Sequence, residues 1–325
     1  MSGGRTRTQA GVDFTVFLQN MAVAAQQVAI LYIIVAVGFI ADRLKLFTED
    51  IARAATNLLF YFVTPSVIIT SFLSMDYSPE RAKALGIAFL GAVCTKLLGI
   101  VLSKPLFGKD AELTPVYRFG AVYGNMGYMA LPMANAVLGE EGVFYCSAGV
   151  VAFNVVCFTH GISLMDKSKK DGKRFNLKRV ILNPGVISVT LGLPLFLFGI
   201  TLPKLVLQPL QYLAGMNTPL AMIFFGTYIA NTDIKKMFLD KKIYLVALLK
   251  LIVMPLVMFG LYKLLGLSGV LLTACMISSS APSANNTVMF AAKYGRDTGL
   301  ASKVVALVSF ISVFTMPVMI ALASS

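Results

Sequence analysis

Seven polar side chains surround a proline inside an apolar segment that runs from Ile277 to Gly295. The proline is Pro282, and the polar residues are Ser278, Ser279, Ser280, Ser283, Asn285, Asn286 and Thr287. Proline lacks a backbone donor and clashes with the preceding turn, so a continuous helix is disfavoured here. At bilayer depth, broken backbone is tolerated only where protein or a water-filled cavity surrounds it. The segment therefore predicts either an interrupted helix lining a substrate path, or a kinked helix whose polar groups bond neighbouring helices.

A second segment of the same kind runs from Ala121 to Gly139, and it favours the first interpretation. Its Pro132-Met133-Ala134-Asn135 matches Pro282-Ser283-Ala284-Asn285 at an offset of 150 residues. Three further pairs recur at an offset of 154 residues: Thr64-Pro65 with Thr218-Pro219, Lys96 with Lys250, and Gly38 with Gly192. Together these matches indicate two homologous halves. Paired broken segments at corresponding positions of two halves are typical of a transporter binding site.

The polar groups of the two segments predict a binding site for an anion. A helix that breaks near the bilayer midplane exposes N–H groups at one half-helix start and carbonyls at the other half-helix end. We expect the amides that follow Pro132 and Pro282 to hold a carboxylate, as half-helix N-termini do in other transporters. The candidate substrate-binding residues are Asn125, Tyr128, Pro132, Asn135, Ser280, Pro282, Asn285 and Asn286. Tyr128 would contact the rest of the substrate, or it is a core aromatic with a satisfied hydroxyl.

Lys96 and Lys250 are the two formal charges well inside apolar segments. A charge inside the membrane is costly and by default functional. The two lysines attract the anionic substrate, or they neutralise the carbonyl ends of the broken helices in place of a cation, or they snorkel to an interface. The repeat relationship favours the second role, because a symmetric pair suits a symmetric crossover.

Titratable and metal-binding groups are otherwise sparse within the spans. His160 is the single histidine of the chain, near the end of an apolar segment that also holds Asn154. It has no partners for a metal site, so we expect no metal and no cofactor; a proton relay or an interfacial hydrogen bond remains open. Asp42 and Asp233 lie at segment ends. Transport would then be driven by the membrane potential, by a sodium ion held on neutral oxygens, or by exchange.

Composition sets the fold class. With 57% hydrophobic residues, a mean hydropathy of +0.79 and 13% charged residues, the chain is an all-α polytopic membrane protein. Spans of about 20 residues give ten transmembrane helices, arranged as two inverted five-helix repeats in which helices 4 and 9 are broken and cross. The expected spans are Ala22–Ala41, Ile51–Leu73, Ala84–Leu102, Ala121–Leu138, Val143–Met165, Pro184–Leu202, Leu210–Ala230, Ile243–Leu265, Val270–Ala292 and Val304–Ala323.

The expected domain organisation follows from these spans. Residues 1–21 form an N-terminal tail without the apolar core of a signal peptide, and residues 22–165 form the first repeat. Residues 166–183 form a basic cytoplasmic connector, and residues 184–325 form the second repeat.

The net charge of +13 reports membrane orientation rather than nucleic-acid binding. Twenty lysines and arginines fall in one set of alternate loops, and six fall on the other side. By the positive-inside rule the basic loops are cytoplasmic, and both termini are outside. Since each half has an odd number of spans, the halves are inverted relative to each other, as alternating access requires. We therefore expect a multi-pass protein of the cell membrane whose partners are a small organic anion and the lipid bilayer, with no nucleic acid.

Several motifs resemble the auxin efflux carrier family. They are Gly124-Asn125-Met126-Gly127-Tyr128-Met129-Ala130-Leu131-Pro132 followed by Leu138-Gly139-Glu140-Glu141-Gly142, then Phe60-Tyr61-Phe62-Val63-Thr64-Pro65, and Pro282 followed by Phe290-Ala291-Ala292-Lys293-Tyr294. The resemblance covers about Leu31 to Ala323. The family comprises plant PIN carriers and bacterial permeases for small carboxylates such as malate or malonate. Because the connector at Asp166 to Arg179 is short, the chain resembles the bacterial type.

The resemblance implies a fold like that of bile-acid transporters and sodium/proton antiporters. Spans 1, 2, 6 and 7 would form a scaffold that makes a homodimer, and spans 3 to 5 with 8 to 10 would form a moving transport domain. An enzyme is disfavoured, because the sequence has no HExxH, no GxSxG and no mid-span aspartate pair. The alternative function is a non-transporting membrane sensor that binds an organic anion in the same fold.

Overall fold

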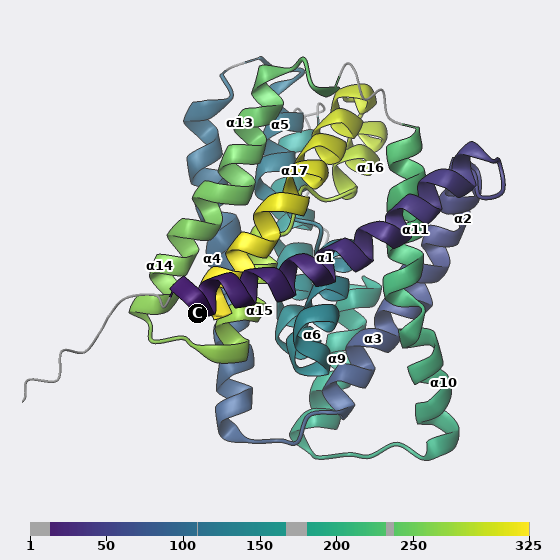
Figure 1. The fold of residues 1–325 in the computed structure, drawn as a ribbon, viewed down its shortest axis with the longest axis vertical. Helices are drawn as coiled ribbons and strands as arrows, with labels where there is room; N and C mark the ends of the chain where they lie inside the picture. The colour runs from purple at the N-terminus through teal and green to yellow at the C-terminus, as the bar shows by residue number, and fades with distance from the viewer. Residues whose placement is uncertain (1–13, 109, 167–180, 232–236, 325) are drawn as a thin grey trace, which may run out of the picture.

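The structure is a computed structural model that describes residues 14–108, 110–166, 181–231 and 237–324. The parts of the expected N-terminal tail before residue 14, and most of the expected connector, lie outside the described residues. The described chain is helical, with one isolated antiparallel bridge. Its helices surround a central region where several of them end (Figure 1).

The helices come in the following order. The first half contains α1 (Phe14–Arg43), α2 (Glu49–Leu58), the π-helix η1 (Leu59–Val63), α3 (Thr64–Leu73), α4 (Pro79–Leu106), α5 (Thr114–Val122), η2 (Met126–Ala130), α6 (Leu131–Val156), η3 (Cys157–Gly161) and α7 (Ile162–Met165). The second half contains α9 (Pro184–Leu197), α10 (Lys204–Gly215), α11 (Asn217–Ala230), α13 (Lys241–Leu248), η4 (Leu249–Val253), α14 (Met254–Leu264), α15 (Gly269–Ser280), α16 (Asn286–Lys293) and α17 (Thr298–Ser324).

Five helical stretches in the described part of the chain are long and apolar enough to cross a membrane. They are Pro79–Leu106, Met126–Met165, Lys204–Ala230, Lys241–Leu264 and Thr298–Ser324. Shorter apolar helices add Leu59–Leu73, Pro184–Leu197 and Gly269–Ser280. The prediction of an all-α polytopic membrane protein is confirmed at this level. The count of ten spans and the division into repeats stay predictions.

Among the described residues, three of the four π-helical turns end two residues before a proline. The residue before each proline donates its N–H to the carbonyl five residues back: Thr64 to Leu59, Leu131 to Met126, and Met254 to Leu249. The next residue is Pro65, Pro132 or Pro255, which has no N–H to continue the ladder. The hydrogen-bond register therefore shifts at these points without breaking the helix.

The closest helix contact in the described chain joins α1 to α11. In Figure 1, α1 runs diagonally across the molecule and reaches α11 on its way to α2. A Cβ atom at Gly38 would lie 2.2 Å from the Ile223 carbonyl oxygen, and one at Gly226 would lie 2.0 Å from the Val35 carbonyl oxygen. The two backbones touch, so glycine is required on both helices.

Both segments that the sequence predicts to be interrupted are interrupted. Helix α5 ends at Val122 and η2 begins at Met126, whereas α15 ends at Ser280 and α16 begins at Asn286. Figure 1 shows α5 and α16 in the upper half of the molecule and α6 and α15 in the lower half. The extended residues between these helices meet at the centre.

The first break lies inside the expected segment Ala121–Leu138, but before its proline. Pro132 lies in the first turn of α6, which continues η2, and it is tolerated because the π-helical shift of register leaves no hydrogen bond for its missing N–H. The break lies earlier, at residues 123–125. The bridge pairs Gly124 with Ser283, so the residue facing Pro282 is Asn125 rather than Pro132. The matching Pro-x-Ala-Asn motifs therefore do not occupy equivalent places at the crossover.

Candidate functional site

The two extended segments hold each other through backbone hydrogen bonds. Asn125 donates its N–H to the Pro282 carbonyl at 2.7 Å, and Ala284 donates its N–H to the Tyr123 carbonyl at 2.9 Å. The Ser283 hydroxyl donates to the Gly120 carbonyl at 2.7 Å. These bonds satisfy polar backbone groups that the broken helices leave open, as the interior of a membrane protein requires.

Three helices begin beside this crossover, and each has an asparagine at its N-cap. Asn125 caps η2 by accepting a hydrogen bond from the Tyr128 N–H at 3.1 Å. Asn183 caps α9 by accepting one from the Gly185 N–H at 2.9 Å. Asn285 is the N-cap residue of α16, and its side chain makes no capping bond. Helix N-termini carry partial positive charge, so this arrangement favours an anion.

A small cavity lined by both polar and apolar groups lies against the crossover, with a volume of about 60 Å³. Three of the predicted site residues line it: Asn125, Tyr128 and Asn286. The polar residues that sequence reasoning did not assign to the site are Thr64, Asn154 and Asn183, and the aromatic rings of Phe60 and Phe153 complete much of the wall. We call this space the central cavity.

The other predicted residues do not line the central cavity. The Ser280 hydroxyl donates to the Met276 carbonyl of its own helix at 2.7 Å. Pro282 acts through its carbonyl, which pairs with Asn125, while Pro132 and Asn285 lie outside the lining. Asn135 is exposed and lines a different cavity of about 270 Å³ between α3, α6 and α10.

The larger cavity and the central cavity share a wall. Thr64 lines the central cavity and donates its hydroxyl hydrogen to Asn217 Oδ1 at 3.3 Å, and Asn217 lines the larger cavity. Glu140 also lines the larger cavity. Because a carboxylate stands there, the larger cavity is less suited to an anion than the central one.

Two of the residues that sequence reasoning missed carried a usable signal. Asn183-Pro184 is the sequence of a helix start, with asparagine at the N-cap and proline at the first helical position. Asn183 is the last residue of the expected cytoplasmic connector, but in the structure its side chain is buried, with 5% of the residue surface exposed. Thr64 precedes a proline in a repeated Thr-Pro pair. Asn154 stands alone in an apolar helix, and its position gave no indication of which way it faces.

Both intramembrane lysines are buried, and Lys250 lies directly behind the crossover. A Cβ atom at Gly124 would be 3.0 Å from both Lys250 Nζ and the Ala281 carbonyl oxygen. Lys96 Nζ donates to the Ala92 carbonyl of its own helix at 3.2 Å. Neither lysine is among the residues that line the central cavity. This placement favours charge compensation of the crossover over direct contact with a substrate.

His160 is connected to the crossover through Tyr123. The Tyr123 hydroxyl lies 2.9 Å from His160 Nδ1 and donates to the Val156 carbonyl at 3.1 Å. The backbone carbonyl of Tyr123 is the acceptor for Ala284. Tyr123 therefore joins α5, η3 and the second broken segment.

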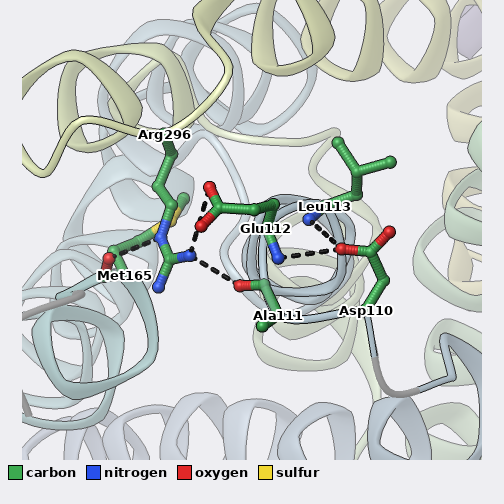
Figure 2. Close-up of polar contacts among 6 residues, drawn as sticks. All are labelled: Asp110, Ala111, Glu112, Leu113, Met165 and Arg296. Atoms are coloured by element: carbon green, nitrogen blue, oxygen red, sulfur yellow. Dashed lines mark hydrogen bonds and ion pairs between the residues drawn. The ribbon is translucent and has the colours of Figure 1, made fainter.

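A second polar cluster joins three chain segments away from the central cavity (Figure 2). Arg296 donates to the Met165 carbonyl at 2.8 Å and to the Ala111 carbonyl at 2.6 Å, and its guanidinium lies 3.9 Å from the Glu112 carboxylate. The backbone N–H groups of Leu113 and Glu112 lower the pKa of the neighbouring Asp110. The cluster connects the start of α5, the end of α7 and the loop before α17, so these elements are held as one unit.

A helical membrane protein in which two interrupted helices cross beside a cavity that several asparagines line has the organisation of a membrane transporter. The sequence model of the family described as "Membrane transport protein" matches residues 23–320. The chain belongs to this family, and the resemblance to the auxin efflux carriers is confirmed. The membership places the chain among transport proteins rather than enzymes.

Three relatives show how far the similarity extends. The chain is 27% identical to an uncharacterized transporter of Methanocaldococcus jannaschii, over 84% of this chain and 90% of the relative. It is 25% identical to an uncharacterized transporter of Methanothermobacter thermautotrophicus, over 88% and 93%. It is 24% identical to a Rhizobium meliloti protein named "Putative malonate transporter", over 63% of this chain and 65% of that protein.

Proposed function

We propose that the chain is a secondary transporter that binds a small organic anion, a carboxylate, in the central cavity and moves it by alternating access. The observation that carries the proposal is the convergence of three helix starts on one cavity at the crossover, which is lined by Asn125 before η2, Asn183 before α9 and Asn286 of α16. Such a cavity offers hydrogen-bond donors and positive helix ends to a ligand that has only acceptors.

The orientation of the Asn125 side-chain amide supports an anionic ligand. Its oxygen accepts a hydrogen bond from a backbone N–H, which can only donate, so the NH₂ group is the end left for a ligand. Asn125 is 4% exposed and lines the central cavity. Lys250 adds a positive charge behind the same backbone. A carboxylate fits this donor set better than a cation does.

The proposed movement is elevator-like, with two inverted five-helix repeats supplying a fixed scaffold and a moving domain. Close glycine packing between α1 and α11 supports a rigid scaffold on one side. On the other side, Arg296, between the ninth and tenth expected spans, bonds Met165 at the end of the fifth span and Ala111 before α5, which supports movement of these elements as one body.

We further propose that the protein lies in the cell membrane as a homodimer, with both termini outside. The interface would use the spans that the family resemblance assigns to the scaffold; on and beside α9 and α10 these expose the apolar side chains of Phe198, Leu205 and Tyr212. Cross-linking of native membranes tests the dimer, because a monomer-only pattern contradicts it.

The experiment that tests transport is uptake of labelled malonate into proteoliposomes, with and without sodium and an imposed membrane potential. The relative named for malonate makes this the first compound to test. We expect uptake by the wild type and its loss in Asn125→Asp, which keeps the η2 cap but places a negative charge in the central cavity.

The control is Ser78→Asp, which makes the same kind of change at the α4 N-cap, where the hydroxyl accepts from the Arg81 N–H. Its uptake should match that of the wild type. Malonate binding without uptake under every gradient would favour a sensor. Absence of carboxylate binding and uptake across a panel of mono- and dicarboxylates would contradict the proposed function.

A further inference from the structure

Two helices, α3 and α6, line both the central cavity and the larger cavity. In α3, Thr64 lines the central cavity, and Val67 and Ser71 line the larger cavity three and seven residues further along. In α6, Val143 lines the larger cavity, and Val150 lines the central cavity seven residues further along. Residues at these spacings lie on one side of a helix. One face of each helix therefore runs from one cavity to the other.

The two cavities differ in how they meet the protein surface. Exposed residues stand in the wall of the larger cavity, among them Asn135, Glu140 and Gln211, so this cavity is open to the surface. The residues that line the central cavity are all buried or half-buried. A ligand that enters the central cavity must therefore pass a wall, and the larger cavity lies on the other side of one such wall.

A hydrogen bond between α3 and α11 lies in the wall between the cavities. The Thr64 hydroxyl donates to Asn217 Oδ1 at 3.3 Å, and the two residues are 6% and 3% exposed. The hydroxyls of Ser66, Thr70 and Ser71 donate instead to backbone carbonyls three or four residues back. The bond from Thr64 is longer than the usual range of about 2.5–3.0 Å for a hydroxyl donor, so it is a weak contact between two helices.

Both partners of this bond stand where a helix changes its course. Thr64 follows the π-helix η1, and its N–H bonds the Leu59 carbonyl five residues back. Asn217 begins α11, whereas α10 ends at Gly215, so a single residue separates the two helices. Short π-turns and helix ends are places where helices adjust during conformational changes. The wall is therefore built from positions that can move without unfolding a continuous helix.

We propose that the Thr64–Asn217 hydrogen bond is a gate between the two cavities, and that the larger cavity is the route by which the substrate reaches the central cavity. While the bond is made, α3 and α11 close the wall. When the bond is released, the cavities join along the shared faces of α3 and α6. This inference rests on the proposed function, because it concerns how the substrate reaches the same cavity, but its test uses no carboxylate.

The charge on Glu140 fits a passage rather than a binding site. A carboxylate in the wall of the larger cavity disfavours retention of an anion there. Glu140 is exposed, so salt and water screen its charge and an anion can still pass it. The substrate then moves on to the central cavity, where hydrogen-bond donors await it.

The test measures how quickly a thiol in the central cavity reacts with a small anionic reagent in the purified full-length protein. Val150→Cys places the thiol in the cavity wall. The reagent is (2-sulfonatoethyl) methanethiosulfonate, and modification at position 150 is measured by peptide mass spectrometry. Thr64→Val removes the hydroxyl at nearly constant shape, so modification should become about threefold to tenfold faster, as loss of one ordinary hydrogen bond predicts. Thr64→Ser keeps the donor and should stay within about twofold of the unmodified gate.

A second variant tests the route. Ala214 lines the larger cavity, and in Ala214→Trp the indole ring would obstruct it. Modification at position 150 should then slow by about threefold or more, because of the large size of the ring. Leu205→Trp is the control, since Leu205 lies on the same helix and is 88% exposed. Its rate of modification should equal that of the Val150→Cys protein alone.

Each outcome supports or overturns the inference. Unchanged modification in a folded Thr64→Val variant overturns the gate, and so does equal acceleration by Thr64→Ser and Thr64→Val. If Thr64→Val does not fold, Ala214→Trp decides, because unchanged modification in that variant overturns the route and the gate with it. Failure of the wild type to bind any carboxylate, together with the expected modification rates, removes the proposed function and leaves the gate between the cavities standing.

Discussion

The contact between α1 and α11 and the contact between the two broken segments both bring two stretches of backbone together, by opposite means. At α1 and α11 the helices are continuous, and glycine lets their backbones touch at Gly38 and Gly226. At the crossover the helices stop, and extended backbone pairs Asn125 with Pro282 and Ala284 with Tyr123. The first contact leaves no space between the helices, whereas the second lies against the central cavity.

The comparison shows where each kind of contact suits the function. Where glycines let two helices touch, the backbone groups have no other hydrogen-bond partners to take up, because each is already satisfied within its own helix. The crossover places helix ends, a buried lysine and asparagine side chains around a cavity, and these groups can exchange partners with a ligand. Rigidity is therefore expected at α1 and α11, and ligand response at the crossover.

The largest effect is expected from Gly226→Ala. The added methyl group would meet the Val35 carbonyl oxygen at 2.0 Å, so α1 and α11 must separate. We expect the free energy of unfolding to fall by more than the usual loss of about 1–3 kcal/mol for overpacking. The variant should therefore fail to purify as a monodisperse species. Gly86→Ala is the control, because nothing lies within 4 Å of its Cβ position. Equal stability of the two variants would refute the close contact.

A smaller effect is expected from Lys250→Met, which keeps the side-chain length but removes the charge behind the crossover. Leaving the carbonyl ends uncompensated should cost about 1–3 kcal/mol. Melting temperature should fall and recover partly as sodium is added, if a cation replaces the lost charge. Lys96→Met serves for comparison, since its amine bonds to its own helix. Unchanged melting temperature with a large loss of malonate affinity would make Lys250 a substrate ligand.

The smallest effect is expected from Arg296→Lys in the cluster of Figure 2. Lysine keeps the charge but lacks the planar guanidinium whose separate N–H groups bond the Met165 and Ala111 carbonyls at the same time. We expect a loss of about 1–2 kcal/mol and slower transport with unchanged malonate affinity. Lys293→Ala, at an exposed position, provides the control. Reduced malonate affinity in Arg296→Lys would mean that the cluster belongs to the binding site.

The sequence predicted the chemistry of the site better than its geometry. Interrupted apolar segments rich in asparagine and serine indicated a crossover, because such residues are costly in a plain membrane helix. The first break lies within the expected segment but before Pro132, since a proline at a register shift and a proline at a break look alike in sequence. The break itself follows from Gly124 and Asn125, where small size and capping matter together.

Long-range placement explains the residues that the sequence analysis left out. Asn183 is separated from Asn125 by several helices in the chain and joins it only through the packing of α9 on α6. Ser280 and Asn135 have the right chemistry, but one bonds to its own helix and the other faces the larger cavity. A helical pattern identifies polar residues, whereas the direction they face depends on how neighbouring helices are rotated.

The most direct test of the central claim is a structure of the protein with bromomalonate, in which anomalous scattering locates the bromine. We predict a single strong bromine peak in the central cavity, next to Asn125 and Asn286, and its loss in Asn125→Asp crystals. A peak in the larger cavity beside Asn135 and Glu140, with none in the central cavity, would contradict the account.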